Sequence, residues 1–107
     1  MNKLTKNYII DFTNVKYYLE MHYVIKEALD FPDYYGCNWS AFWDCLTDMY
    51  GDIINIRIIG IDVIKNKFDD AAEKMLEILK RFKHYSHYFE DDITIEIFIG
   101  DEKTLIQ

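Results

Sequence analysis

The sequence predicts an α/β fold in which a small three-stranded parallel sheet is packed with about three to four helices. Two observations carry this prediction. Short runs of β-branched and aromatic residues occur at residues 8–12, 53–60 and 93–99, and segments with apolar residues at three- and four-residue spacing lie between them. The order is strand, helix, helix, strand, helix, strand, which is typical of parallel strands joined by right-handed crossovers.

Length and composition indicate one domain, residues 1–107, with a substantial core. Half of the residues are hydrophobic and only one is proline, so no segment has the composition of a disordered linker. No run of about 18 apolar residues is present, which predicts that nothing spans a membrane. The segment Met1–Ile10 also lacks an apolar run of signal-peptide length, so we expect a cytoplasmic protein.

The first strand is predicted at Tyr8–Phe12, a short run of β formers. Thr13 or Asn14 can cap the helix that follows. The apolar stripe of that helix consists of Val15, Tyr18, Leu19, His22, Ile25 and Leu29. We expect the helix to end before Pro32, because the residue that precedes a proline is disfavoured in the α region.

A loop at residues 33–37 is predicted to lead into a second helix, from Trp39 to about Met49. Gly36 gives the loop a residue that is free to take a positive φ, and Asn38 is the expected N-cap. The buried stripe of this helix is predicted to comprise Phe42, Cys45, Leu46 and Met49, with Trp39 alongside. The opposite side then carries Ser40, Asp44, Thr47 and Asp48, with Trp43 at the border.

The second half of the chain holds the remaining predicted elements. Residues 53–60 are mostly apolar and too few for a typical helix, which predicts a buried strand, and residues 61–68 are expected to form a turn. The segment from Asp69 to about His84 is predicted to be a helix whose apolar stripe is Ala72, Met75, Leu76, Leu79 and Phe82. We expect a last strand at residues 93–99, a polar tail at residues 101–107, and an ion pair between Arg57 and Glu96 across the sheet.

Negative charge is concentrated in one segment. From Glu27 to Ile56 there is no lysine, arginine or histidine, and the segment contains six acids: Glu27, Asp30, Asp33, Asp44, Asp48 and Asp52. This segment therefore accounts for six of the seven net negative charges. A field of one sign repels nucleic acid and anionic membranes and accelerates encounter with a basic protein. Aromatic residues beside uncompensated acids are typical of a hot spot that binds a basic surface.

Cysteine and histidine chemistry is less well supported by the sequence. The candidate nucleophiles and bases are Cys37, Cys45, His22, His84 and His87. Cys45 lies on a buried stripe, and Cys37 has no motif around it except a loop glycine, so ordinary thiols are expected. If both cysteines lie on one helix, their Cα atoms are roughly 12 Å apart, which is too far for a disulfide bond. A zinc site at His84 and His87 lacks further ligands that can be placed.

Acid–base catalysis is also not expected. Asp44 and Asp48 would lie on an open helix face rather than in a cleft. The chain has no P-loop, no G-x-G-x-x-G and no G-x-S-x-G motif. The sequence therefore predicts a protein that is not an enzyme and that needs neither a metal nor a cofactor.

Two adjacent motifs carry a family resemblance. They are Pro32-Asp33-Tyr34-Tyr35-Gly36-x-Asn38 and Ala41-Phe42-Trp43-Asp44-x-Leu46-Thr47. Together with a helix that ends before Pro32, a strand after the acidic helix and a closing Asp92-Ile93-Thr94-Ile95 run, they resemble the barstar family of intracellular inhibitors of barnase-type bacterial ribonucleases. The resemblance covers roughly residues 8–99.

The resemblance implies inhibition of a nuclease by a helix and its preceding loop, which block the active site. By position, Asp44 would take the place of an RNA phosphate among basic groups of the target. From the resemblance and the acidic helix face together, the predicted partner-binding residues are Tyr34, Tyr35, Gly36, Asn38, Ser40, Trp43, Asp44, Thr47 and Asp48.

The chain also departs from the family type. Ser40 stands where the type has an aspartate, Met49 where it has a tryptophan, and Arg81 falls near the position of a contact glutamate. Asp48 adds an acid one turn beyond Asp44, so the acidic surface is shifted toward the C-terminal end of the helix. These departures predict a different target more than a different mode of binding.

The predicted function is therefore inhibition of a basic ribonuclease or a related toxin nuclease, as in bacterial toxin immunity. Two alternatives remain open: an interaction module for a basic partner that is not a nuclease, and a small thiol hydrolase built on Cys37. We expect no binding to nucleic acid or membranes, and a monomer when the protein is free.

Overall fold

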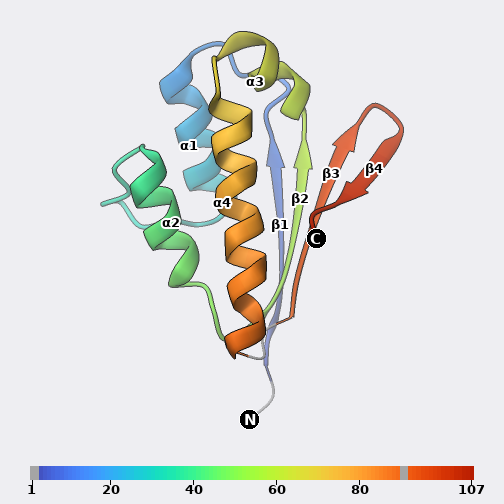
Figure 1. The fold of residues 1–107 in the computed structure, drawn as a ribbon. Coiled ribbons are helices and arrows are strands. Elements are labelled where there is room, and N and C mark those ends of the chain that lie inside the picture. Colours follow the sequence, from blue (N-terminus) through green and yellow to red (C-terminus); the bar gives the residue numbers. More distant parts are fainter. Residues whose placement is uncertain (1–2, 90–91) are drawn as a thin grey trace.

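The computed structural model of the protein describes residues 3–89 and 92–107. Met1 and Asn2, which belong to the segment inspected for a signal peptide, lie outside the described residues. The elements in chain order are β1 (Thr5–Asp11), α1 (Tyr18–Ala28), α2 (Trp39–Thr47), β2 (Ile53–Ile59), α3 (Ile61–Lys67), α4 (Ala71–Tyr85), the short 3-10 helix η1 (Ser86–Phe89), β3 (Ile93–Ile99) and β4 (Glu102–Leu105) (Figure 1). None of the helices in the described ranges is long and apolar enough to cross a membrane.

The strands form one sheet in the order β1-β2-β3-β4. β1, β2 and β3 are parallel, and β4 runs antiparallel to β3. The predicted α/β class and its three parallel strands are confirmed. The prediction of a polar tail at residues 101–107 was wrong, because residues 102–105 form the fourth strand. Gly100, with φ 59°, lies in the turn that brings this strand back along β3. Ile106 follows, is buried, and donates its backbone N–H to the carbonyl of Ile95.

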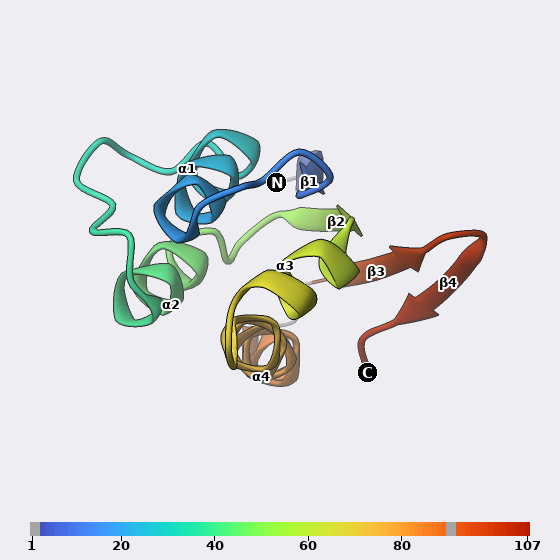
Figure 2. The ribbon, with the colours of Figure 1, turned by 90° about the horizontal axis from the view of Figure 1, so that it is seen from above.

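The helices lie on one face of the sheet, and the other face is open (Figure 2). The two crossovers, from β1 to β2 and from β2 to β3, step in the same direction across the sheet. Because crossovers between parallel strands share one handedness, both place their helices on the same face. The burial of β2 follows from this: Ile54, Ile56 and Ile58 are buried, whereas Arg57 and Ile59, which point to the other face, are exposed. The buried strand predicted at residues 53–60 is therefore covered on one face only.

The predicted ion pair across the sheet lies on this open face. Nε of Arg57 is 3.3 Å from Oε1 of Glu96, and Nζ of Lys103 on β4 is 3.2 Å from Oε2 of the same carboxylate. The hydrogen bond from Lys103 and the charge of both cations hold the pKa of Glu96 below its usual value. Both cations are more than half exposed, so the cluster contributes little to stability.

The first helix begins later than predicted. Thr13 does not cap it, because its backbone N–H and its hydroxyl both donate to the carboxylate of Asp11 in a turn after β1. The N-cap is Tyr17, and Met21 is fully buried on α1 beside His22 and Ile25. The predicted stripe was wrong at Tyr18 and Leu19, which are exposed.

Residues 61–67 form helix α3 rather than the predicted turn. Ile61 and Ile64 are buried one helical turn apart, which gives this short segment an apolar face. Gly60 precedes it with φ 78°, and a Cβ at that position would lie 2.8 Å from the backbone nitrogen of Thr13. Only glycine therefore fits where the ends of β1 and β2 meet α3.

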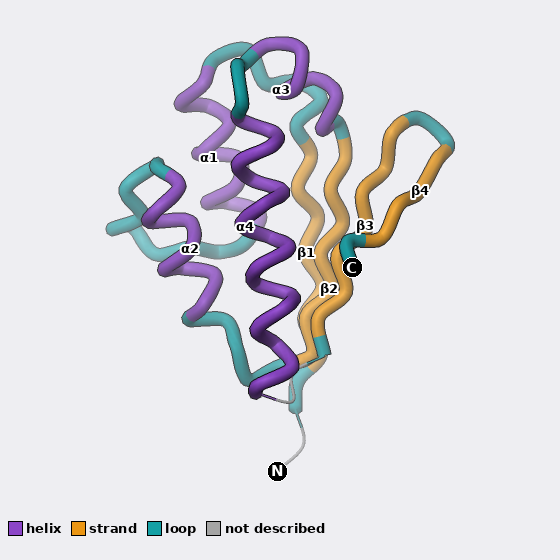
Figure 3. The backbone as a smooth tube through the Cα atoms, viewed as in Figure 1, coloured by secondary structure: helices purple, strands orange, loops and turns teal. Residues whose placement is uncertain are grey.

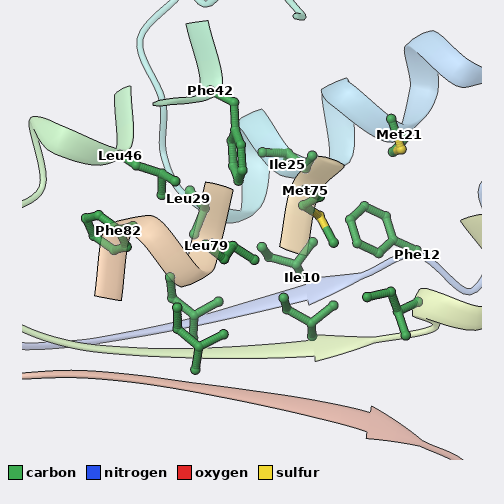
Figure 4. Packing of buried hydrophobic residues seen from close by; sticks show 14 of the residues in the cluster. Ile10, Phe12, Met21, Ile25, Leu29, Phe42, Leu46, Met75, Leu79 and Phe82 are labelled. Atoms are coloured by element: carbon green, nitrogen blue, oxygen red, sulfur yellow. The ribbon is translucent and has the colours of Figure 1, made fainter. Parts of the chain in front are cut away.

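The core joins the acidic helix to the rest of the fold. Phe42 and Leu46 point from α2 toward Leu79 and Phe82 of α4, and Ile25 of α1 adjoins them (Figure 4). The predicted stripe of α2 is confirmed, with Phe42, Cys45 and Leu46 buried and Met49 partly buried. The stripe of α4 is confirmed as well, with Ala72, Met75, Leu79 and Phe82 buried and Leu76 partly buried. The polar side of α2 is thereby turned to solvent.

Candidate functional site

The loop between α1 and α2 is fixed at its first end by the way α1 terminates (Figure 3). The backbone N–H of Phe31 donates to the carbonyl of Lys26 at 2.9 Å, and that of Asp30 to Glu27 at 3.4 Å, with Asp30 at φ 54°. This is a Schellman motif, with an aspartate in the position that glycine usually occupies. It ends the helix before Pro32, as predicted, and places Phe31 in the core.

Tyr35 anchors the middle of the loop to α1. Its side chain is 5% exposed, and its hydroxyl lies 2.7 Å from Nδ1 of His22, which is fully buried. The ring of Trp39 packs on the same imidazole, with centroids 4.8 Å apart. Tyr35 thus faces the interior, whereas its neighbour Tyr34 is 77% exposed. Tyr35 was predicted from the sequence as a partner-binding residue, and that prediction did not anticipate that its side chain faces the interior.

The second end of the loop is held by Asn38. Its Oδ1 accepts a hydrogen bond from the backbone N–H of Ala41 at 2.8 Å, which confirms the predicted N-cap. Its Nδ2 donates to the carbonyl of Gly36 at 3.2 Å. Positive φ is found at Cys37 (φ 54°) and not at Gly36, so the prediction for Gly36 was wrong. The loop therefore enters the helix through a turn closed by the Asn38 side chain.

The solvent-facing side of α2 carries Ser40, Asp44 and Asp48, all exposed, and Thr47, which is partly buried. The hydroxyl of Thr47 donates to the carbonyl of Asp44 at 2.8 Å. Asp48 is at the C-cap, where the helix dipole disfavours negative charge, and the last turn of α2 has no basic residue. Folding stability therefore does not account for the charge of this face.

In the folded protein, salt bridges with lysines neutralise part of the negative charge of the acidic segment. Lys26 lies 3.4 Å from the carboxylate of Asp33, and Lys6 lies 3.1 Å from that of Asp52. The hydrogen bond to Asp52 raises the pKa of Lys6. Neither lysine was counted with these acids, because Lys26 directly precedes the segment from Glu27 to Ile56 and Lys6 lies in β1. Within residues 3–89 and 92–107, Asp44 and Asp48 form no salt bridge.

Helix α4 contributes a second side to this surface. The guanidinium of Arg81 lies 4.6 Å from the centroid of the Trp43 ring, and Tyr85 packs against the same ring at 6.1 Å. Ile78, Arg81 and Tyr85 recur at helical spacing on α4 and line hollows beside α2. These three residues are absent from the predicted partner-binding set, although the family resemblance placed Arg81 near a contact position. The signal that could have found them is this three- and four-residue spacing outside the buried stripe of α4.

The cysteines and histidines weighed for chemistry lie on several different elements of the fold. Cys37 and Cys45 are free thiols, as predicted, and burial raises the pKa of the Cys45 thiol, which disfavours the thiolate that a nucleophile needs. The rings of His84 and His87 are 6.4 Å apart. The described part of the chain contains no group of three or more histidine, cysteine or acidic side chains arranged to hold a metal ion.

Comparison with known proteins adds two findings. A family model described as "Barstar (barnase inhibitor)" matches residues 5–99. The chain is also similar to the "Putative ribonuclease inhibitor YrdF" of Bacillus subtilis (strain 168). The two are 33% identical over 70 residues, which make up 65% of this chain and 74% of that protein.

Proposed function

The chain belongs to the barstar family, and from this premise we propose that it inhibits a basic ribonuclease or a related toxin nuclease. In the proposed complex, α2 and the loop before it cover the active site of the nuclease. The relative from Bacillus subtilis, which is named "Putative ribonuclease inhibitor YrdF", supports this proposal. So does the position of the acidic face, which the core of the protein turns outward.

The observation that carries the proposal is the state of Asp44. This carboxylate is exposed, lies at the middle of the solvent-facing side of α2, and forms no salt bridge with any described residue. A ribonuclease must bind the phosphate of its substrate with cationic groups, and an unpaired carboxylate on a rigid helix can occupy the same place. Asp44 would thus act as a substitute for an RNA phosphate.

The proposed contact surface follows from exposure and position. Tyr34 supplies an exposed aromatic ring from the loop, and Trp43 supplies a partly buried one on α2. The proposed contact residues are Tyr34, Gly36, Asn38, Ser40, Trp43, Asp44, Thr47 and Asp48. Tyr35 is assigned a supporting role, because its buried hydroxyl is engaged with His22.

The proposed cellular setting follows from the same chemistry. An acidic inhibitor would meet a basic toxin nuclease in the cytoplasm of a bacterial cell that must be protected from it, and it would do so as a monomer that carries out no catalysis of its own. The net charge of −7 favours fast encounter with such a target and disfavours binding to RNA itself.

A titration tests the proposal. Increasing amounts of the purified protein are added to basic ribonucleases of the host, and RNA cleavage is followed at low salt and again at physiological salt. We expect cleavage by one of them to stop at a one-to-one ratio. An unrelated acidic protein of the same net charge serves as the control for non-specific association. If every basic ribonuclease keeps its full rate, and a basic protein without nuclease activity co-purifies instead, the interaction-module alternative is correct.

A further inference from the structure

The surface between α2 and α4 carries two opposite charges that do not neutralise each other. One groove there is lined by Trp39, Ser40, Trp43, Asp44, Ile78 and Arg81. Asp44 lies on the α2 side of this groove and Arg81 on the α4 side. Neither side chain forms a salt bridge within the described residues, so the two charged groups are not in direct contact.

The side chain of Arg81 is held in place without losing its charge. Its guanidinium lies over the face of Trp43, a contact that fixes a cation but leaves its N–H groups free for acceptors. Trp43 is itself supported by Tyr85. The base of the surface is fixed as well, because the hydroxyl of Tyr50 donates to the carbonyl of Phe82 at 2.7 Å and so ties the turn after α2 to α4.

We propose that this groove binds a protein surface that carries both positive and negative charge, in which a basic group faces Asp44 and a carboxylate faces Arg81. The inference rests on the proposed function and specifies the target: a nuclease with an acidic residue beside the cationic groups of its active site. A guanidinium and a carboxylate form paired, parallel hydrogen bonds, so Arg81 selects for this arrangement more strictly than a lysine would.

The anion that faces Arg81 belongs to the partner protein and not to an RNA. Asp44 and Asp48 are exposed on the same surface, and no cation of the described residues forms a salt bridge with them, so they repel a polyanion. The hollow on the other side of Arg81 is lined by Trp43, Thr47, Tyr50 and Tyr85, which suits the apolar part of a protein side chain. Aromatic residues around one arginine are typical of the centre of a protein interface.

Reversing the charge of Arg81 distinguishes this proposal from a general attraction between an acidic inhibitor and a basic target, because the two predict opposite changes in affinity. Against a target that presents only cations, Arg81→Glu removes a repulsion and strengthens binding. Against a target with a carboxylate at this place, the same change brings two carboxylates together and weakens binding. Lys80→Glu is the matched control, because Lys80 is an exposed cation at the adjacent position of α4 and lines neither hollow.

The experiment measures the affinity of these variants, by calorimetry without RNA, for the ribonuclease that the unmodified protein inhibits. We expect Arg81→Glu to raise the Kd by at least about tenfold and Lys80→Glu to change it by less than about threefold. Thermal unfolding of each free variant verifies that its fold is retained. Replacing each acidic residue around the active site of the nuclease by lysine should identify one change that restores the affinity of Arg81→Glu.

Two results would overturn the inference while leaving the proposed function intact. The first is an Arg81→Glu variant that inhibits as well as or better than the unmodified protein. The second is a loss of affinity that occurs only when RNA is added, which would assign the anion to an RNA phosphate. Absence of inhibition by the unmodified protein is a different outcome and contradicts the proposed function itself.

Discussion

The imidazole of His22 and the phenol of Tyr35 form a buried link between α1 and the loop that precedes α2. Nδ1 of His22 lies 2.7 Å from the hydroxyl of Tyr35, and the two side chains are 0% and 5% exposed. Nε2 of His22 has no hydrogen-bond partner among the described residues. The link therefore holds Tyr34 and Gly36 at the edge of the proposed interface from beneath.

Removing the hydroxyl of Tyr35 should destabilise the fold. Tyr35→Phe leaves the buried imidazole of His22 without its hydrogen bond, which we expect to lower the free energy of unfolding by about 1–3 kcal/mol. Urea denaturation measures the change. Tyr34→Phe makes the same chemical change at an exposed position and should alter stability by less than about 0.5 kcal/mol. Equal effects at the two positions would show that the buried link does not stabilise the loop.

Stability should fall in mildly acidic solution because of His22. Burial lowers the pKa of its imidazole below the ordinary 6.5, so the unfolded chain binds a proton more readily than the folded one. This contribution to stability is fully present above pH 6.5. It is lost as the pH falls from 6.5 toward the lowered pKa of the folded state.

Urea midpoints between pH 7.5 and pH 5 measure this effect. The variant His22→Gln has no titrating group at this position and should show a flatter profile across that range. Asp11 does not interfere: hydrogen bonds from Thr13 lower its pKa below 3.8, so its contribution is lost only in more acidic solution. Parallel profiles for the two proteins would exclude His22 as the source.

The thiol of Cys37 should be dispensable, and its backbone conformation should favour glycine. Cys37 has φ 54°, a region in which a Cβ costs about 1 kcal/mol. Cys37→Gly and Cys37→Ala both remove the sulfur and differ only in the Cβ, so we expect the glycine variant to be more stable by about 1 kcal/mol. Denaturation and the inhibition assay are applied to both. A loss of activity in both variants would favour the thiol hydrolase alternative.

Regular periodicity made most of the fold predictable from the sequence. The two clear helical stripes, at Phe42–Leu46 and at Ala72–Phe82, were located because buried residues recur at the period of a helix. α3 and β4 were missed because they are short and their role depends on tertiary contacts. Ile61 and Ile64 contact a core that residues from distant parts of the chain create, and β4 exists only by pairing with β3.

The site was predictable where it is local in sequence. The N-cap at Asn38 and the exposed acids of α2 follow from neighbouring residues. The burial of Tyr35 could not be predicted from neighbouring residues, because it depends on His22, thirteen positions earlier in the chain. Arg81 could not be placed over Trp43 either, since that contact depends on the packing of α4 beside α2.

The most direct test of the account concerns Asp44. Asp44→Asn keeps the shape of an exposed side chain and removes the charge that is proposed to replace an RNA phosphate. Asp101→Asn makes the same change in the turn between β3 and β4, on the far side of the molecule from α2 (Figures 1 and 2). Affinity for the inhibited ribonuclease is measured for both variants. We predict that Asp44→Asn weakens binding by at least about 2 kcal/mol, or about 30-fold, and that Asp101→Asn leaves it nearly unchanged; equal effects from the two changes would contradict the assignment of this surface.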